Sequence, residues 1–184
     1  HTQSSAASDV YKRQSIHFIT SEEGLNMSYK RITLSTSGIS KMIRKLADDN
    51  VKVNLALSLH AANEELRKKI MPIGKSNTLE EIRDSLKYYF SKTKKKVTYE
   101  YVLLRDVNDS IEDAYQLYKY TKHLSSKVNI IEYNAVEGLE FKKSSFEKTE
   151  KFIGYLLKKG VNVSLRRSRG KDINAACGQL ANKN

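Results

Sequence analysis

Cys177 is the only cysteine in the 184-residue sequence, and cationic residues precede it closely. Arg166, Arg167, Arg169 and Lys171 share with it the run RRSRGKDINAACGQL. A thiol reacts as its thiolate, and nearby positive charges favour that form. The same arginines could bind phosphate groups. This setting predicts a nucleophilic cysteine, whereas a lone cysteine in an ordinary setting is more often a small buried side chain.

Hydroxyl groups and a histidine are further candidates for ligand contact. Ser35 opens the run STSG, whose glycine would let a ligand approach the backbone. The same run could equally be a turn that caps a helix. His60 follows an apolar stretch, where a hydrogen-bonded structural role is more common than that of a base or a metal ligand. No histidines or cysteines are paired at ligand spacing, so the sequence predicts no metal site.

Short apolar or β-branched runs alternate with longer segments of helical period, which indicates βα units around a parallel sheet. The expected strands are residues 31–35, 53–59, 97–104, 128–133 and 161–166. The expected helices lie within residues 39–46, 79–90, 114–124 and 146–157. A hydroxyl residue followed three positions later by an acid predicts a capping box. Such pairs are Thr78 with Glu81, Ser110 with Asp113, and Ser144 with Glu147.

The C-terminal ends of parallel strands are where barrels of βα units gather their ligand contacts. Ser35, Ser58, His60 and Asn134 fall at such ends in the expected sheet. Because five strands do not close a barrel, we expect an α/β fold that is a partial barrel of parallel strands with outer helices, its first strands missing. Residues 1–14 lack any apolar period, and we interpret them as a non-native leader before a single domain over residues 15–184.

Glu100 lies in the middle of the third expected strand, on the face shared with Thr98 and Val102. A carboxylate that faces a barrel lumen is costly to desolvate unless it is paired. Arg166 or a ligand cation could be that partner. An exposed edge position would explain the same residue, so Glu100 is not counted among the site residues.

The formal net charge is +12, from 33 Lys and Arg against 21 Asp and Glu. Such a balance favours a polyanionic partner, with nucleic acid ahead of a membrane surface, although lysine-rich faces also serve solubility alone. No apolar stretch approaches the roughly 20 residues needed to cross a membrane. A single cysteine excludes an internal disulfide framework and suits the reducing cytoplasm. The sequence also lacks a GxGxxG run, a Walker A run and a Ser-His-Asp pattern.

Several motifs together resemble one family, the radical S-adenosylmethionine adenine-C2 RNA methyltransferases. They are residues 31–38 (RITLSTSG), 58–61 (SLHA), 108–110 (NDS), 128–134 (VNIIEYN), 166–170 (RRSRG) and 176–180 (ACGQL). The resemblance runs from about residue 15 to the C-terminus, in family order and spacing. The family's N-terminal domain and first barrel strands have no counterpart in it.

The resemblance implies a two-step methylation of carbon 2 of an adenine in 23S rRNA and, in some members, in tRNA. One S-adenosylmethionine methylates Cys177, and a second, cleaved at a [4Fe-4S] cluster, provides the radical that activates the methylated cysteine. The family's cofactor contacts fall on Ser35, on Ser58, Leu59 and His60, and on Asn134. We expect a cytoplasmic, monomeric enzyme, and a cluster of this kind needs an electron donor.

Departures from the family pattern leave alternatives open. The cluster motif Cys-x-x-x-Cys-x-x-Cys is absent from this chain, so the chain alone should be inactive. Ala135 stands where the family usually has proline, and Asn174 where an aspartate is common. A carbon-8 adenine methyltransferase of the same family shares the carrier cysteine. A non-catalytic basic RNA-binding module is the alternative from another class, and a phosphate-binding metabolic barrel is a third.

Overall fold

A computed structural model describes residues 14–135 and 138–166 of the chain. One sheet carries five parallel strands in the order β1-β2-β3-β4-β5, so sequence neighbours are also neighbours in space. The strands are β1 (Thr33–Thr36), β2 (Asn54–Ser58), β3 (Val97–Leu103), β4 (Ser126–Glu132) and β5 (Val163–Arg166). All five expected strands are confirmed, and the α/β fold with a parallel sheet and outer helices is confirmed with them.

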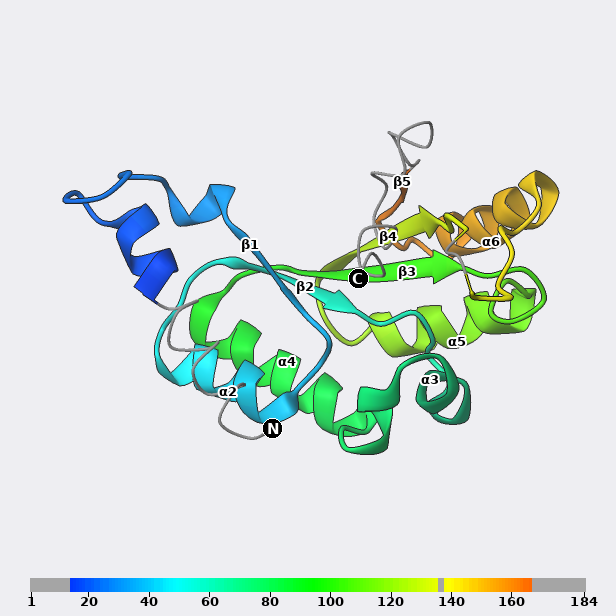
Figure 1. Cartoon of the computed structure of the whole chain (residues 1–184), viewed down its shortest axis with the longest axis horizontal. Helices are drawn as coiled ribbons and strands as arrows, with labels where there is room; N and C mark the ends of the chain where they lie inside the picture. The colour runs from blue at the N-terminus through cyan, green and yellow to red at the C-terminus, as the bar shows by residue number, and fades with distance from the viewer. Residues whose placement is uncertain (1–13, 136–137, 167–184) are drawn as a thin grey trace.

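Helices connect the strands, and α2, α4 and α5 lie along one side of the sheet (Figure 1). The α-helices between and after the strands are α2 (Ser40–Asp48), α3 (Glu64–Ile70), α4 (Leu79–Thr93), α5 (Ile111–Thr121) and α6 (Phe146–Lys158), with 3-10 turns η1 (Tyr29–Arg31) and η2 (Pro72–Lys75). Four of these helices match the expected periodic segments. Parallel strands require such crossovers because each chain must return to the same end of the sheet before the next strand begins.

The helix starts test the expected capping boxes. Thr78 and Glu81 form a reciprocal box at the start of α4, and Ser110 and Asp113 form one at the start of α5. The expected box at Ser144 is wrong. The residue that caps α6 is Ser145, whose hydroxyl accepts from the Lys148 N–H at 3.2 Å.

Helix α3 was missed because its seven residues offer too few apolar positions to show a period. Its signals are local instead: Asn63 accepts from the Leu66 N–H, Glu64 and Glu65 follow, and Pro72 comes shortly after the end. An N-cap residue, an acidic first turn and a proline beyond the C-terminus are the marks of a short helix.

The two faces of the sheet differ in burial. Along β3, Val97, Tyr99, Tyr101 and Leu103 are buried on the helix side, and the residues between them are half-buried. The helix side joins the main core, to which α4 contributes Ile82 and Leu86 and α6 contributes Phe152 and Leu156. Within the described parts of the chain, no helix is long and apolar enough to cross a membrane.

Candidate functional site

A cavity of about 420 Å³ lies toward the C-terminal ends of the strands, and its lining includes residues from β1 to β5. Ser35, Ser58, His60 and Asn134 all line it, although they come from three separate strand ends. Apolar side chains form much of the remaining wall, among them Ile70, Met71, Val102, Leu139 and Phe141. A largely apolar pocket with a few converging polar groups, of a size between about 300 and 1,000 Å³, is the usual form of a small-molecule site.

Leu59 and Cys177 are the expected site residues that do not line this cavity. The Leu59 side chain is fully buried in the core between the sheet and the helices, so only its backbone is placed near the site. Its N–H donates to the Glu100 carbonyl at 3.0 Å. Cys177 lies outside the described residues, as do Arg167, Arg169 and Lys171.

The turn after β1 is held by a buried arginine that the sequence did not single out. Arg67, on α3, is fully buried, and its Nη2 donates to the Ser37 carbonyl at 2.7 Å. Gly38 has a φ of 96°, and a Cβ there would lie 3.1 Å from the same Nη2. The glycine therefore supplies both the left-handed backbone and the space that the arginine needs. The alternative that this run caps the next helix is wrong, since the N-cap of α2 is Ile39 and makes no side-chain cap.

His60 is fixed in a neutral form by its surroundings. Its φ is 56°, and its Nδ1 accepts from the Val102 N–H at 3.2 Å. Burial, with a smaller contribution from the charge of Arg67, lowers the pKa of His60 to about 4. At neutral pH the imidazole is therefore uncharged, and because Nδ1 accepts, its proton lies on Nε2. The ring can offer a hydrogen bond to a ligand, but it is not a base poised near pH 7.

Asn108 ties the ends of β2 and β3 together around His60. Its Nδ2 donates to the His60 carbonyl at 2.7 Å and to the Val102 carbonyl at 2.8 Å, while its Oδ1 accepts from the Leu104 N–H at 2.7 Å. The side chain is fully buried. This single amide satisfies three backbone groups where the two strands end, which fixes the histidine-bearing turn against β3.

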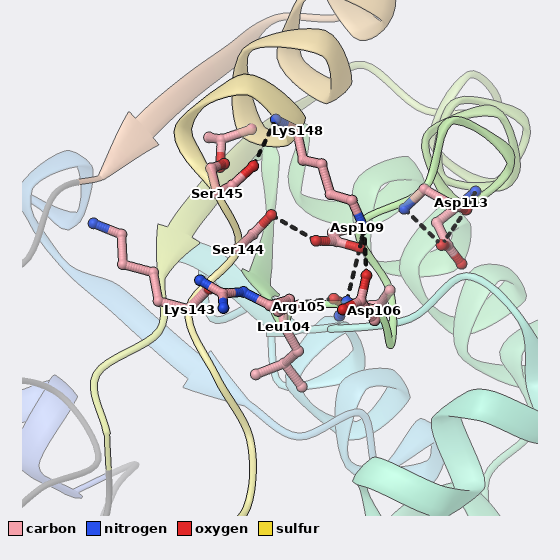
Figure 2. Close-up of polar contacts among 12 residues, drawn as sticks. Leu104, Arg105, Asp106, Asp109, Asp113, Lys143, Ser144, Ser145 and Lys148 are labelled. Carbon is pink, nitrogen blue, oxygen red and sulfur yellow. Dashed lines mark hydrogen bonds and ion pairs between the residues drawn. The ribbon is translucent and has the colours of Figure 1, made fainter.

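A polar clasp fixes the segment that follows β4 against the loop after β3 (Figure 2). The buried Asp109 accepts from the Ser144 hydroxyl at 2.6 Å and from the Asp106 N–H at 3.0 Å, and Lys148 pairs with both aspartates. The Arg105 N–H also donates to the Lys142 carbonyl at 2.8 Å. The clasp holds residues 142–148 against the loop after β3, so the chain just before it, which carries Leu139 and Phe141, stays at the cavity wall.

Glu100 lines the cavity, although it was not counted among the expected site residues. Its Oε1 accepts from Asn129 Nδ2 at 2.9 Å, and Asn129 Oδ1 accepts in turn from the Ser164 hydroxyl at 2.8 Å. The expected ion pair with Arg166 does not form among the described residues, although Arg166 lines the same cavity. Strand alternation placed Glu100 on the correct face, and only the sheet register could show its amide partner.

The described residues 14–135 and 138–166 contain no group of three or more His, Cys, Asp or Glu side chains that could hold a metal ion. Cys177 is the only cysteine of the whole chain, so three thiolates for an iron–sulfur cluster cannot come from it.

Comparison with known proteins identifies the family. The model of the Radical SAM superfamily matches residues 6–118, and the chain belongs to that superfamily. A crystal structure of a radical SAM methyltransferase from Sphaerobacter thermophilus superimposes with a TM-score of 0.87 at 37% identity, over 91% of this chain and 49% of that one.

Curated relatives are more similar in sequence. The chain is 55% identical over 170 residues to a probable dual-specificity RNA methyltransferase RlmN from Flavobacterium psychrophilum, and 51% identical over 170 residues to one from Christiangramia forsetii. These alignments cover 92% of this chain but 49% and 48% of the relatives. The chain thus spans about half the length of the curated relatives it matches.

Membership of the superfamily implies S-adenosylmethionine as cofactor and a [4Fe-4S] cluster in the full-length protein. The cavity fits the nucleoside cofactor in its chemistry, because apolar walls suit a base while Ser35, Ser58, Asn134 and the Nε2 of His60 offer polar groups. It also holds a buried carboxylate oxygen, Glu100 Oε2, that has no hydrogen-bond partner among the described residues.

Proposed function

We propose that this chain is the C-terminal part of an RNA methyltransferase that methylates carbon 2 of adenine in 23S rRNA, and of an adenine in tRNA. The carrying observation is that Ser35, Ser58, His60 and Asn134 converge on one cavity in a chain about half identical to RNA methyltransferases. The net charge of +12 supports a polyanionic substrate. We further propose that the enzyme is cytoplasmic and monomeric and takes electrons from a separate donor.

Each named residue has a role in this proposal. S-adenosylmethionine, when bound, supplies both the methyl group and the radical that activates it. Ser35, Ser58, His60 and Asn134 hold the cofactor by polar contacts, and Leu59 contributes backbone groups only, since its side chain is in the core. Cys177 carries the one-carbon unit as a thioether before it reaches the adenine. A neutral His60 suits this assignment, because it can donate a hydrogen bond without adding positive charge beside a sulfonium.

The cluster ligands lie outside this chain in the proposal, because the chain has one cysteine. Residues 15–184 then form the later part of a radical-SAM barrel. Methylation therefore requires a protein of the relatives' full length that carries this sequence.

The decisive experiment replaces Cys177 by serine in that full-length protein. We expect methylation of the target adenine to fall to background while RNA binding is retained, because serine is nearly isosteric but does not form a thioether. Mass spectrometry of nuclease-mapped RNA measures the product and also separates carbon 2 from carbon 8. Methylation that persists in Cys177→Ser would refute the carrier role of Cys177. Salt-dependent RNA binding without methylation by the unsubstituted full-length protein would instead favour the RNA-binding module.

A further inference from the structure

Glu100 is a cavity residue whose chemistry the proposed function does not yet use. Its Oε2 is buried and has no hydrogen-bond partner among the described residues, and no cation of these residues forms an ion pair with it. A buried acceptor without a partner is costly in a folded protein. A bound ligand can supply the missing hydrogen-bond donor, and Glu100 lies in the wall of the cavity.

The carboxylate is also held in a fixed orientation. Glu100, Asn129 and Ser164 are register neighbours on β3, β4 and β5. The Ser164 hydroxyl donates to Asn129, which donates to Glu100 Oε1. Because each link uses one defined donor and one defined acceptor, this row orients the carboxyl group and leaves only Oε2 for a ligand.

Ser58 continues the same row on the other side. It is the register partner of Glu100 on β2, and it lines the same cavity. Neighbouring strands lie about 4.8 Å apart, so a hydroxyl and a carboxylate stand side by side in the wall. A pair of adjacent hydrogen-bonding groups at this spacing suits a vicinal diol, in which each hydroxyl can donate and accept.

The competing donor would be an ammonium group. An ammonium carries three N–H donors and needs several acceptors when buried, whereas the part of this row that lines the cavity offers Glu100 Oε2 and the Ser58 hydroxyl. One hydroxyl donor fits this surrounding better.

We propose that Glu100 recognises the ribose of the nucleoside cofactor, with Oε2 accepting a hydrogen bond from one of the two ribose hydroxyls beside Ser58. Glu100 is then a specificity-determining residue for a ribonucleoside ligand. The inference rests on the proposed function only in taking the ligand to be S-adenosylmethionine.

Calorimetric titration of the full-length protein with S-adenosylhomocysteine and its 2′-deoxy and 3′-deoxy analogues tests this inference. Glu100→Gln keeps the size of the side chain and an oxygen for Asn129, but it turns a donor toward the ribose. We expect it to weaken S-adenosylhomocysteine binding by about tenfold or more. One of the two analogues lacks the hydroxyl that Glu100 binds. The unsubstituted protein and Glu100→Gln should bind this analogue with similar affinity, because the missing hydroxyl and the substitution remove the same contact.

Thr98→Val is the matched control, because Thr98 lies on the same face of β3 but outside the cavity lining. It should leave all three affinities unchanged. Equal weakening of all three ligands by Glu100→Gln would mean a general structural effect and would overturn the inference, even if the variant were less stable. Unchanged binding in Glu100→Gln would overturn it too, with the proposed function intact. Failure of the unsubstituted protein to bind S-adenosylhomocysteine would instead count against the proposed function, and the inference with it.

Discussion

The two faces of β3 differ in how their buried polar atoms are hydrogen-bonded. On the helix side, the Tyr101 hydroxyl donates to the Asn108 carbonyl at 3.0 Å, and its ring packs 5.5 Å from that of Phe152. On the cavity side, Glu100 Oε2 is buried without a hydrogen-bond partner among the described residues. On one face of this strand the Tyr101 hydroxyl is hydrogen-bonded within the protein. On the other face a Glu100 oxygen remains available to a ligand.

This difference separates stability from binding within a single element. Burial raises the pKa of Tyr101 well above its usual value, so its hydroxyl stays neutral and paired at every physiological pH. The helix side contributes dispersion and apolar burial. The cavity side keeps half-buried polar groups whose arrangement the backbone register determines. Changes on the first face should act mainly on folding, and changes on the second mainly on ligand affinity.

The largest expected effect is on the helix side. Phe152→Ala should lower the free energy of unfolding by about 3 to 5 kcal/mol, because it empties a fully buried site against Tyr101. Phe146 is 67% exposed on the same helix, so Phe146→Ala is a matched control with little expected loss. Urea denaturation measures both. Similar losses in the two variants would contradict the assignment of α6 packing to Phe152.

A pH-dependent effect of intermediate size should come from His60. Its folded pKa of about 4 lies below the unfolded value of about 6.5, so the unfolded chain binds more protons between these values. Stability should therefore be full above pH 6.5 and fall as the pH drops toward 4, by up to about 3 kcal/mol. His60→Asn tolerates the left-handed backbone and removes the titration. Denaturation at several pH values gives the free energy of unfolding as a function of pH. Its fall between pH 6.5 and 4 should be smaller in His60→Asn, and an unchanged fall would contradict the burial of a neutral ring.

The smallest effect should come from a helix cap remote from the cavity. Thr78→Ala removes half of the α4 capping box and should cost about 1 kcal/mol, with ligand affinity unchanged. Thr98→Val, a threonine change on the cavity-side face of β3, should alter stability by less than about 0.5 kcal/mol. Thermal unfolding measures the stability of both variants, and a ligand titration measures their affinity. A loss of ligand affinity in Thr78→Ala would show that the two faces are not energetically separate.

Much of the fold was predictable because its signals are local. Alternation in β3 and helical spacing in α4 depend on nearest neighbours along the chain, and both were confirmed. The error at Ser144 shows the limit. Two adjacent serines both suited a cap, and the choice depended on Asp109, which accepts from Ser144 across 35 positions of sequence. No local pattern distinguishes the serine that faces such a distant partner.

The candidate site divides in the same way. Ser35, Ser58, His60 and Asn134 were predictable as strand ends, and the structure brings them to one cavity. Arg67 was missed, because a lysine-rich helix gives no sign that one of its cations is fully buried. Cofactor contact by these residues, and the carrier role of Cys177, stay predictions.

By itself, the sequence determined the alternation of strands with the longer helices, the end of each strand to within one residue, and the excess of positive charge, since composition and short-range periodicity carry all of these. Tertiary structure alone decided which serine caps α6, that His60 is neutral, and that Glu100 is held by Asn129 with one oxygen left over. The physical reason is that burial, register and hydrogen bonding between distant strands depend on the packed chain. Their effects on charge and orientation exist only once the sheet has formed.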